Sequence, residues 1–312
     1  MGLSALSGAA PAGRVLAWWL PSEIRQERDQ LPWRSPAVTP WGVLVSETML
    51  AQTQVGRVAE RYGPFMERFA SPQVVAAEPL GALLRAWQGL GYPRRAANLH
   101  RSAAAIVAEH AGEVPSDLGS LLALPGVGRY TARAVRAFAF DAVTMPVDTN
   151  IGRVLARLAG RRLRESEAQS LGDALAAAHA PVQPEASGGR ATALAFMDLG
   201  ATLCLPSAPR CPECPLREVC SWGSRSLTAP GSRLSDPARG SARVSKSQPP
   251  FEGSDRQGRG RLLRAAAAAP FTAGDVAAAA GWPGDPERAA AAAASLVADG
   301  LLCFEDGSYR LP

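Results

Sequence analysis

Lysine is almost absent from this chain of 312 residues: of its 33 basic residues only Lys246 is a lysine. Chemistry that needs a lysine amine therefore depends on that one residue. Long apolar runs are missing too, since no uninterrupted stretch approaches the ~18 residues of a membrane-spanning helix. The N-terminal residues also lack the basic segment that opens a secretory signal. Together these absences predict a cytoplasmic protein that does not enter a membrane.

Strand patterns are missing from the first 222 residues, where no alternation of apolar and polar residues persists. Apolar residues recur at helical spacing instead. We expect helices over residues 55–69, 79–87, 94–110, 116–123, 129–139, 149–159, 165–179 and 188–203. The predicted fold class of this region is all-α, in one large or two medium domains.

The last 90 residues have a different composition. Residues 223–258 are rich in Ser, Gly, Pro and Arg, so they bury too little to fold and are predicted to be a flexible linker. Residues 259–312 read as three short helices followed by a hairpin turn at Glu305–Gly307, which predicts a winged-helix-like module. Its third helix has one basic residue, Arg288, which is poor for reading a DNA groove. We expect that module to pack or to bind a protein partner.

Four of the five cysteines fall within 17 residues, in the pattern C-x6-C-x2-C-x5-C: Cys204, Cys211, Cys214 and Cys220. Such crowding predicts a metal site. The alternative, a pair of disulfides, is rare in cytosolic proteins. Zinc and an iron–sulfur cluster both accept four cysteines, and the spacing alone does not decide between them.

A glycine turn, Pro125–Gly128, separates two predicted helices. Gly126, Val127 and Gly128 can bring the backbone close to a ligand, and the N–H groups of the next helix suit a phosphate. A tight connection without a ligand is the alternative. The net charge of +5 and a pI of about 9.2 are compatible with a polyanionic partner.

Two carboxylates stand out by position. Asp148 precedes a predicted helix, so it is expected to be an N-cap and to stay ionised with a low pKa. Glu47 shares a helix face with apolar Val43, Leu44 and Leu50, so it is expected to be buried with a raised pKa. Carboxyl groups whose pKa values are pushed apart indicate an acid and an electrostatic partner.

These motifs resemble those of a known family. LPGVGRYTA (124–132), VDTN (147–150) and the cysteine run are similar to the helix-hairpin-helix DNA glycosylases with an iron–sulfur cluster. LPWR (31–34), SETMLAQTQV (46–55) and GLGY (89–92) narrow the resemblance to MutY-type adenine glycosylases, which remove adenine mispaired with 8-oxoguanine. The resemblance covers roughly residues 15–222, with the motifs in the same order.

The resemblance implies a helix-hairpin-helix fold of two helical subdomains. A six-helix hairpin domain would span residues 40–160, and a cluster domain, 161–222, would pack with residues 1–39 across an active cleft. The four cysteines would hold a [4Fe-4S] cluster. The chain would act as a monomer on double-stranded DNA with the adenine flipped out.

The resemblance also implies roles for single residues. Protonated Glu47 would donate to adenine N7 and later help to activate water, and Asp148 would stabilise the oxocarbenium-like sugar. The turn residues 126–128 would grip the DNA backbone. The implied substrate-binding residues are Tyr92 as the wedge, Gln52 and Thr53 beside the opposing base, Tyr130 and Asn150 in the adenine pocket, and Arg34 of LPWR.

Tyr130 predicts the reaction type. The related endonuclease III type has a catalytic lysine after GVGR and no glutamate corresponding to Glu47. Because Tyr130 stands at that position and Lys246 is the only lysine, we expect a monofunctional hydrolase without Schiff-base lyase activity.

The chain departs from the family pattern in two places. The MutT-like domain that helps many members to recognise 8-oxoguanine is replaced by the short C-terminal module, and the usual Gln-Gln pair begins with Ala51. Recognition of 8-oxoguanine would then rest on Gln52, Thr53 and the loop 90–92. Two alternatives stay open: a glycosylase for thymine or uracil opposite guanine with the same fold, and a non-catalytic iron–sulfur protein that binds DNA.

Overall fold

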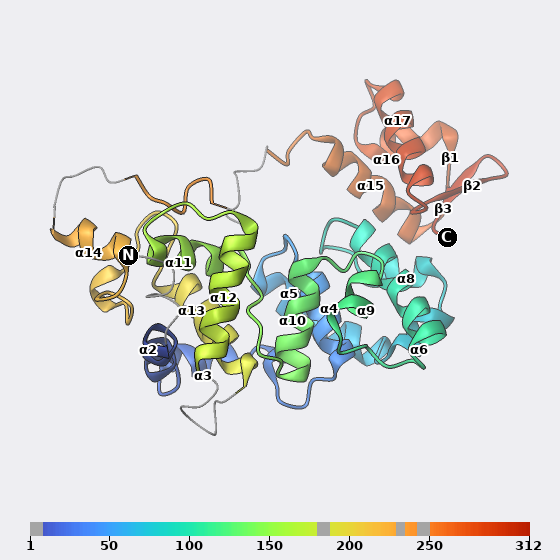
Figure 1. Ribbon diagram of the computed structural model, residues 1–312. Helices are drawn as coiled ribbons and strands as arrows, with labels where there is room; N and C mark the ends of the chain where they lie inside the picture. Colours follow the sequence, from blue (N-terminus) through green and yellow to red (C-terminus); the bar gives the residue numbers. More distant parts are fainter. Residues whose placement is uncertain (1–8, 180–187, 229–234, 242–249) are drawn as a thin grey trace. The chain divides into compact units, whose positions relative to one another are not determined.

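The computed structural model describes residues 9–179, 188–228, 235–241 and 250–312 (Figure 1). Lys246 lies outside them. The chain forms two compact units: unit 1 comprises residues 1–43, 116–119 and 127–246, and unit 2 comprises 44–115, 120–126 and 247–312. The ranges expected from the sequence put residues 127–160 with unit 2, and that grouping stays a prediction.

Among the described residues of unit 1, the regular secondary structure is helical and no strand occurs. Its helices are α2 (Ala9–Trp19), α3 (Glu23–Asp29), α10 (Arg129–Phe140), α11 (Thr149–Ala159), α12 (Glu165–His179), α13 (Gly189–Thr202) and α14 (Ser221–Thr228), with 3-10 turns η1 (Pro32–Arg34) and η3 (Cys211–Glu213). Helix α13 packs against α2, α3, α10, α11 and α12, so it is the centre of this unit. Every residue of α11 from 151 to 158 is buried.

Unit 2 carries most of the remaining helices among the described residues. Helix α4 (Pro40–Leu50), which begins at the end of unit 1, is followed by α5 (Val55–Arg68), α6 (Pro72–Ala77), α7 (Leu80–Ala86), α8 (Arg94–Glu109) and α9 (Leu118–Ala123). The first two residues of α9 belong to unit 1. Helix α8 packs against α6 and α7. Its buried side chains Leu99 and Ile106 fill this core with Leu83 of α7.

The C-terminal module, residues 255–312, belongs to unit 2 and has the winged-helix-like elements expected. Helices α15 (Asp255–Ala268), α16 (Val276–Ala280) and α17 (Pro286–Ala298) accompany the strands β1 (Phe271–Thr272), β2 (Cys303–Glu305) and β3 (Ser308–Arg310), with η4 (Ala273–Asp275) before α16 (Figure 1). The strands form an antiparallel sheet in the order β1-β3-β2. Asp306 and Gly307 both have positive φ, as a two-residue hairpin turn requires.

The all-α expectation for the first 222 residues is confirmed where they are described. Three of the described helices were not expected: α3, α6 and α14. Within the predicted linker, the described residues 235–241 contact the helical region. Asp236 pairs with Arg157 of α11 at 2.6 Å, and the Ser241 hydroxyl accepts the Leu163 amide. Among the described residues, no helix has the length and apolar character that crossing a membrane requires.

Candidate active site

Helix α4 places Glu47 in the core of unit 2. Thr39 and Pro40 start the helix, because the Thr39 hydroxyl accepts the Gly42 amide at 3.1 Å and proline is favoured as the first helical residue. Glu47 is 5 % exposed, so the expected burial of this carboxyl group is confirmed. Among the described acidic residues only Asp198 is also that deeply buried. Burial of an acid without function is costly, which keeps Glu47 a candidate for chemistry.

Arg95 connects the end of α4 with the GLGY loop. Its Nη1 donates to the carbonyls of Thr48 and Met49, both at 2.7 Å, in the last turn of α4. Its Nη2 donates to the Thr53 hydroxyl and to the carbonyls of Leu90 and Gly91. The Arg95 guanidinium thereby donates to carbonyls at the end of α4, which lack partners within the helix. The same group holds the GLGY loop beside the end of α4. Burial lowers the pKa of Arg95 to about 10.

Arg95→Ala is expected to lower the free energy of unfolding by about 2–4 kcal/mol, because several carbonyls lose a charged donor at once. Arg95→Lys should recover only part of this, since an ammonium group lacks the planar fork. Chemical denaturation of both variants measures the effect, with the exposed Arg85→Ala of α7 as the matched control. An Arg95→Ala protein as stable as Arg85→Ala would show that the bridge contributes nothing.

Gln52 and Tyr92 sit on the two segments that Arg95 joins, and both have left-handed backbones, with φ of 65° and 49°. Such conformations cost energy in residues other than glycine and persist where the surrounding structure holds them. The Thr53 hydroxyl donates to the Leu90 carbonyl at 3.0 Å. The structure thus brings the three residues expected at the wedge and the opposing base onto two linked loops of unit 2.

The glycine turn is held from α8. The Ser102 hydroxyl donates to the Pro125 carbonyl at 2.7 Å. Gly126 has a φ of 78°, and a side chain there would meet Asn98 at 2.5 Å, so both conformation and space require glycine. Gly126 and Gly128 are exposed, whereas Val127 is buried. Gly128 is the N-cap residue of α10, which leaves the first N–H groups of that helix uncapped by a side chain.

Asp148 caps α11 in unit 1, as predicted. Its carboxylate accepts the Ile151 amide at 2.7 Å and the Asn150 side-chain amide at 2.9 Å. The expectation of a low pKa is wrong: burial raises the pKa of Asp148, against these hydrogen bonds and the charge of Arg153, which lower it. The desolvation of the carboxylate therefore outweighs the helix terminus.

Asn150 holds Asp148 and is itself held. Its side-chain oxygen accepts from Arg153 Nη2 at 2.8 Å, and Arg153 also donates to the carbonyls of Gly200 and Cys204, both at 2.6 Å. Both ends of the Asn150 amide are thus occupied. A hydrogen-bonded path runs from Asp148 through Asn150 and Arg153 to the cysteine run, within unit 1. Tyr130 lies half-buried in the first turn of α10.

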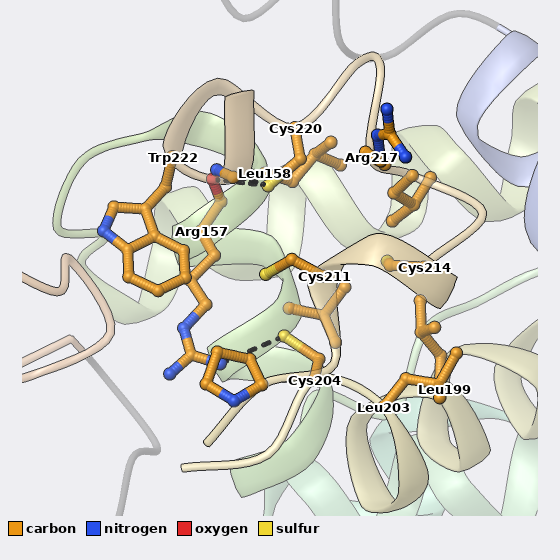
Figure 2. A pocket seen from close by; sticks show the side chains of 14 residues that line it. Arg157, Leu158, Leu199, Leu203, Cys204, Cys211, Cys214, Arg217, Cys220 and Trp222 are labelled. Carbon is orange, nitrogen blue, oxygen red and sulfur yellow. Dashed lines mark hydrogen bonds between the residues drawn. The ribbon is translucent and has the colours of Figure 1, made fainter. Parts of the chain in front are cut away.

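The four cysteines surround one pocket. Cys204, Cys211, Cys214 and Cys220 line it together with apolar Leu199, Leu203 and Leu216 (Figure 2). Arg157 Nη1 donates to Cys204 Sγ at 3.3 Å, and Cys220 Sγ donates to the Arg157 carbonyl at 3.3 Å. Within the described residues, no three His, Cys, Asp or Glu side chains gather closely enough to hold a single metal ion.

The chemistry of these thiols fits a positively charged metal centre. Burial raises the pKa of Cys214 to about 12 and also raises that of Cys220. A metal lowers the pKa of its thiol ligands and compensates for this burial. Arg157, which lies over the Trp222 ring at 4.7 Å, adds a fixed positive charge beside Cys204.

Arg34 does not lie free for a ligand. It forms a two-pronged pair with the fully buried Asp198 of α13, at 2.6 and 2.8 Å, and the Trp19 indole donates to the same carboxylate at 2.9 Å. This pairing ties the N-terminal segment to the central helix of unit 1. Since removing one partner of a buried pair is strongly destabilising, we assign Arg34 a structural role in place of the expected substrate contact.

Comparison with known proteins decides the family. Residues 45–173 match the model of the HhH-GPD superfamily base excision DNA repair proteins. The chain is 41 % identical over 303 residues to the adenine DNA glycosylase of Mycobacterium tuberculosis, a match that covers 96 % of this chain and 92 % of the relative. The chain belongs to the adenine DNA glycosylases. The human adenine DNA glycosylase is 35 % identical over 237 residues, covering 72 % of this chain and 42 % of the human protein.

Solved glycosylase structures share the fold. A thermostable thymine-DNA glycosylase aligns with a TM-score of 0.60 and 26 % identity, over 72 % of this chain and 100 % of its own. Endonuclease III in a non-covalent DNA complex aligns with a TM-score of 0.54 and 26 % identity, over 66 % of this chain and 94 % of its own. These matches confirm the predicted helix-hairpin-helix glycosylase fold.

Three arginines important to this adenine DNA glycosylase fold were missed in the sequence. Arg95 lies in the first turn of α8, where the helix dipole disfavours a cation. Arg153 and Arg157 lie one turn apart in the buried and otherwise apolar stretch 151–158 of α11. An arginine at a helix N-terminus or on an apolar helix face needs a partner from elsewhere in the chain. The unusual positions of these three arginines could therefore have indicated their structural roles.

Proposed function

We propose that this chain hydrolyses the N-glycosidic bond of adenine mispaired with 8-oxoguanine or guanine in duplex DNA, without lyase activity. The observation that carries the proposal is the pair of carboxyl groups on a chain of this family: Glu47, 5 % exposed on an apolar face, and Asp148, held by two hydrogen bonds at a helix N-terminus.

In the proposed reaction, protonated Glu47 donates its proton to adenine N7. The bond between the sugar C1′ and adenine N9 breaks, and its electron pair leaves with the base. The Asp148 carboxylate stabilises the positive charge that develops on the sugar. Water then attacks C1′ and gives a proton to Glu47, which restores the acid.

DNA binding is supported by the exposed Gly126 and Gly128 and by the N-terminus of α10, which no side chain caps; together they offer backbone N–H groups to a phosphate. Gln52, Thr53 and Tyr92 are proposed to act on the opposing base and the base stack. Tyr130 is proposed to line the adenine pocket. Asn150 is proposed to act there mainly by positioning Asp148, because both ends of its amide are occupied.

The four cysteines are proposed to hold a [4Fe-4S] cluster, which would close the 204–220 loop by thiolate ligation. The proposal is supported by the pocket that the four cysteines share and by their partly buried thiols. Iron and sulfide contents near four per chain, with a brown visible absorbance, would match it. Stoichiometric zinc without iron would replace the cluster by a zinc site.

Base release from four duplexes tests the function: adenine opposite 8-oxoguanine, adenine opposite guanine, and thymine or uracil opposite guanine. The proposal expects release from the first two only, with strand breaks appearing only after alkali treatment. Release of thymine or uracil would favour the mismatch alternative, which the thymine-DNA glycosylase fold match makes a specific competitor. Binding without any release would favour the non-catalytic alternative.

Asn150→Ala is expected to move the acid limb of the adenine-release profile to higher pH. The Asn150 amide hydrogen bond lowers the pKa of Asp148, so its loss raises that pKa and leaves less carboxylate at a given pH. Single-turnover rates measured across pH report the shift. Gln169→Ala removes another amide, 2.9 Å from Asp173, and should leave the limb in place. An unshifted limb in Asn150→Ala would remove Asn150 from the positioning of Asp148.

A further inference from the structure

The C-terminal module makes contacts with the part of unit 2 that carries Tyr92. Arg256, in the first turn of α15, donates from Nη1 to the Tyr92 hydroxyl at 3.2 Å. The Arg95 guanidinium lies over the Tyr92 ring, 5.6 Å from its centroid. The side chain of the expected wedge therefore has an arginine from α8 against its ring and an arginine from the module at its tip.

An ion-pair network fixes the module close to that loop. Asp299, at the C-cap of α17, pairs with Arg94, two residues after Tyr92, and with Arg259 of α15 at 2.6 Å. Arg94 and Arg259 lower the pKa of Asp299. The helix dipole disfavours a carboxylate at a helix C-terminus. The positive charges of Arg94 and Arg259 compensate for this and stabilise the Asp299 carboxylate.

A second attachment lies at α7. The Gly81 amide donates to the Pro312 carbonyl at 2.8 Å. A Cβ on Gly81 would lie 2.4 Å from that same oxygen and 3.1 Å from the Leu311 side chain. Leu311 is buried. Leu311 and Pro312 thus pack against Gly81, where any larger residue would collide with them.

The charge of the module does not suit a DNA-reading domain. Residues 255–312 hold six arginines against seven aspartates and glutamates. Arg288, the one basic residue of α17, lies 4.0 Å above the Trp282 ring and pairs with Asp255. Electrostatic attraction to phosphates needs an excess of positive charge, which the module as a whole lacks. Arg256 and Asp299 of the module instead contact Tyr92 and Arg94.

We propose that the C-terminal module is a positioning element for Tyr92: Arg256 orients the hydroxyl of this side chain, and the Asp299 and Pro312 contacts hold the module in place. This rests on the proposed function, in which Tyr92 enters the base stack. A left-handed Tyr92 needs such support to keep one orientation before DNA arrives. The module thereby acts on catalysis through Tyr92 and not by touching the reacting atoms.

A double-mutant cycle in the full-length chain tests the coupling. Arg256→Ala and Tyr92→Phe are each expected to lower the single-turnover rate of adenine release about tenfold, the effect of one hydrogen bond. The double variant should be no slower than the slower single variant, because both changes break the same contact. Arg264→Ala, an exposed arginine on the same helix, should stay at the wild-type rate. Additive losses would mean that Arg256 acts on DNA directly and would overturn the proposal.

Hydrogen exchange measures how firmly the module holds the loop at residues 89–95, independently of adenine release. Gly81→Ala favours the helical state of α7 while displacing Pro312, and Asp299→Ala removes the partner of Arg94. Both variants should lose protection at residues 89–95 and slow adenine release, whereas Arg264→Ala should do neither. Unchanged protection in both variants would overturn the proposal. If the wild-type chain released no adenine, the proposed function would fail, but the exchange data would still report whether the module holds the loop.

Discussion

Glu47→Gln is expected to abolish adenine release while leaving duplex binding intact. The amide keeps the volume of the buried side chain but has no proton to give to adenine N7 and cannot accept one from water. General acid–base groups contribute roughly 10²–10⁴-fold to a rate, so single-turnover release should fall by at least that factor. Affinity should persist because the proposed phosphate contacts at residues 126–128 are unaffected.

The measurement pairs release with binding on the same duplex, adenine opposite 8-oxoguanine. Glu60→Gln, an exposed glutamate on α5, is the matched control and should release adenine at the wild-type rate. Thermal unfolding of both variants shows whether the fold is kept. Full activity in a folded Glu47→Gln protein would assign the acid to another residue and contradict the mechanism.

Local rules were sufficient to predict several site features. Helical periodicity placed Glu47 on a buried face, and the rule that Asp precedes helices placed Asp148 at the N-cap of α11. The short helix α6 was missed although Ser71 caps it and Pro72 begins it. These two residues are a start signal for a helix, so the information was present in the sequence.

Properties set by distant partners could not be predicted this way. The pKa of Asp148 depends on the surrounding atoms that bury it, not on its helix, and the dipole argument therefore gave the wrong direction. Arg34 was located by its motif, but its partner Asp198 lies 164 residues away. The same distance in sequence separates Arg256 from Tyr92. Contacts between residues so far apart in the sequence form only in the folded chain, so no local sequence pattern predicts them.

Asp148→Asn is expected to reduce adenine release by roughly 10²–10³-fold, the usual contribution of a single electrostatic stabiliser. The asparagine can still cap α11 through the Ile151 amide, but it carries no charge to stabilise the sugar. Asp141→Asn is the matched control, since Asp141 also accepts a backbone amide, from Arg190 at 2.9 Å, on an exposed site of unit 1. Release by the control should match the wild type.

The stability of Asp148→Asn should report the raised pKa independently of catalysis. Burial makes the folded state hold the Asp148 proton more tightly than the unfolded state does. The contribution of this group to stability is then fully present below the unfolded pKa and is lost as pH rises through the folded pKa. The wild type should lose stability relative to the variant across that window and nowhere else.

Comparing unfolding free energies as a function of pH removes the constant cost of placing a second amide beside Asn150. A constant difference across the acidic range would show that Asp148 keeps an ordinary pKa, and the acid limb expected from Asn150→Ala would lose its physical basis.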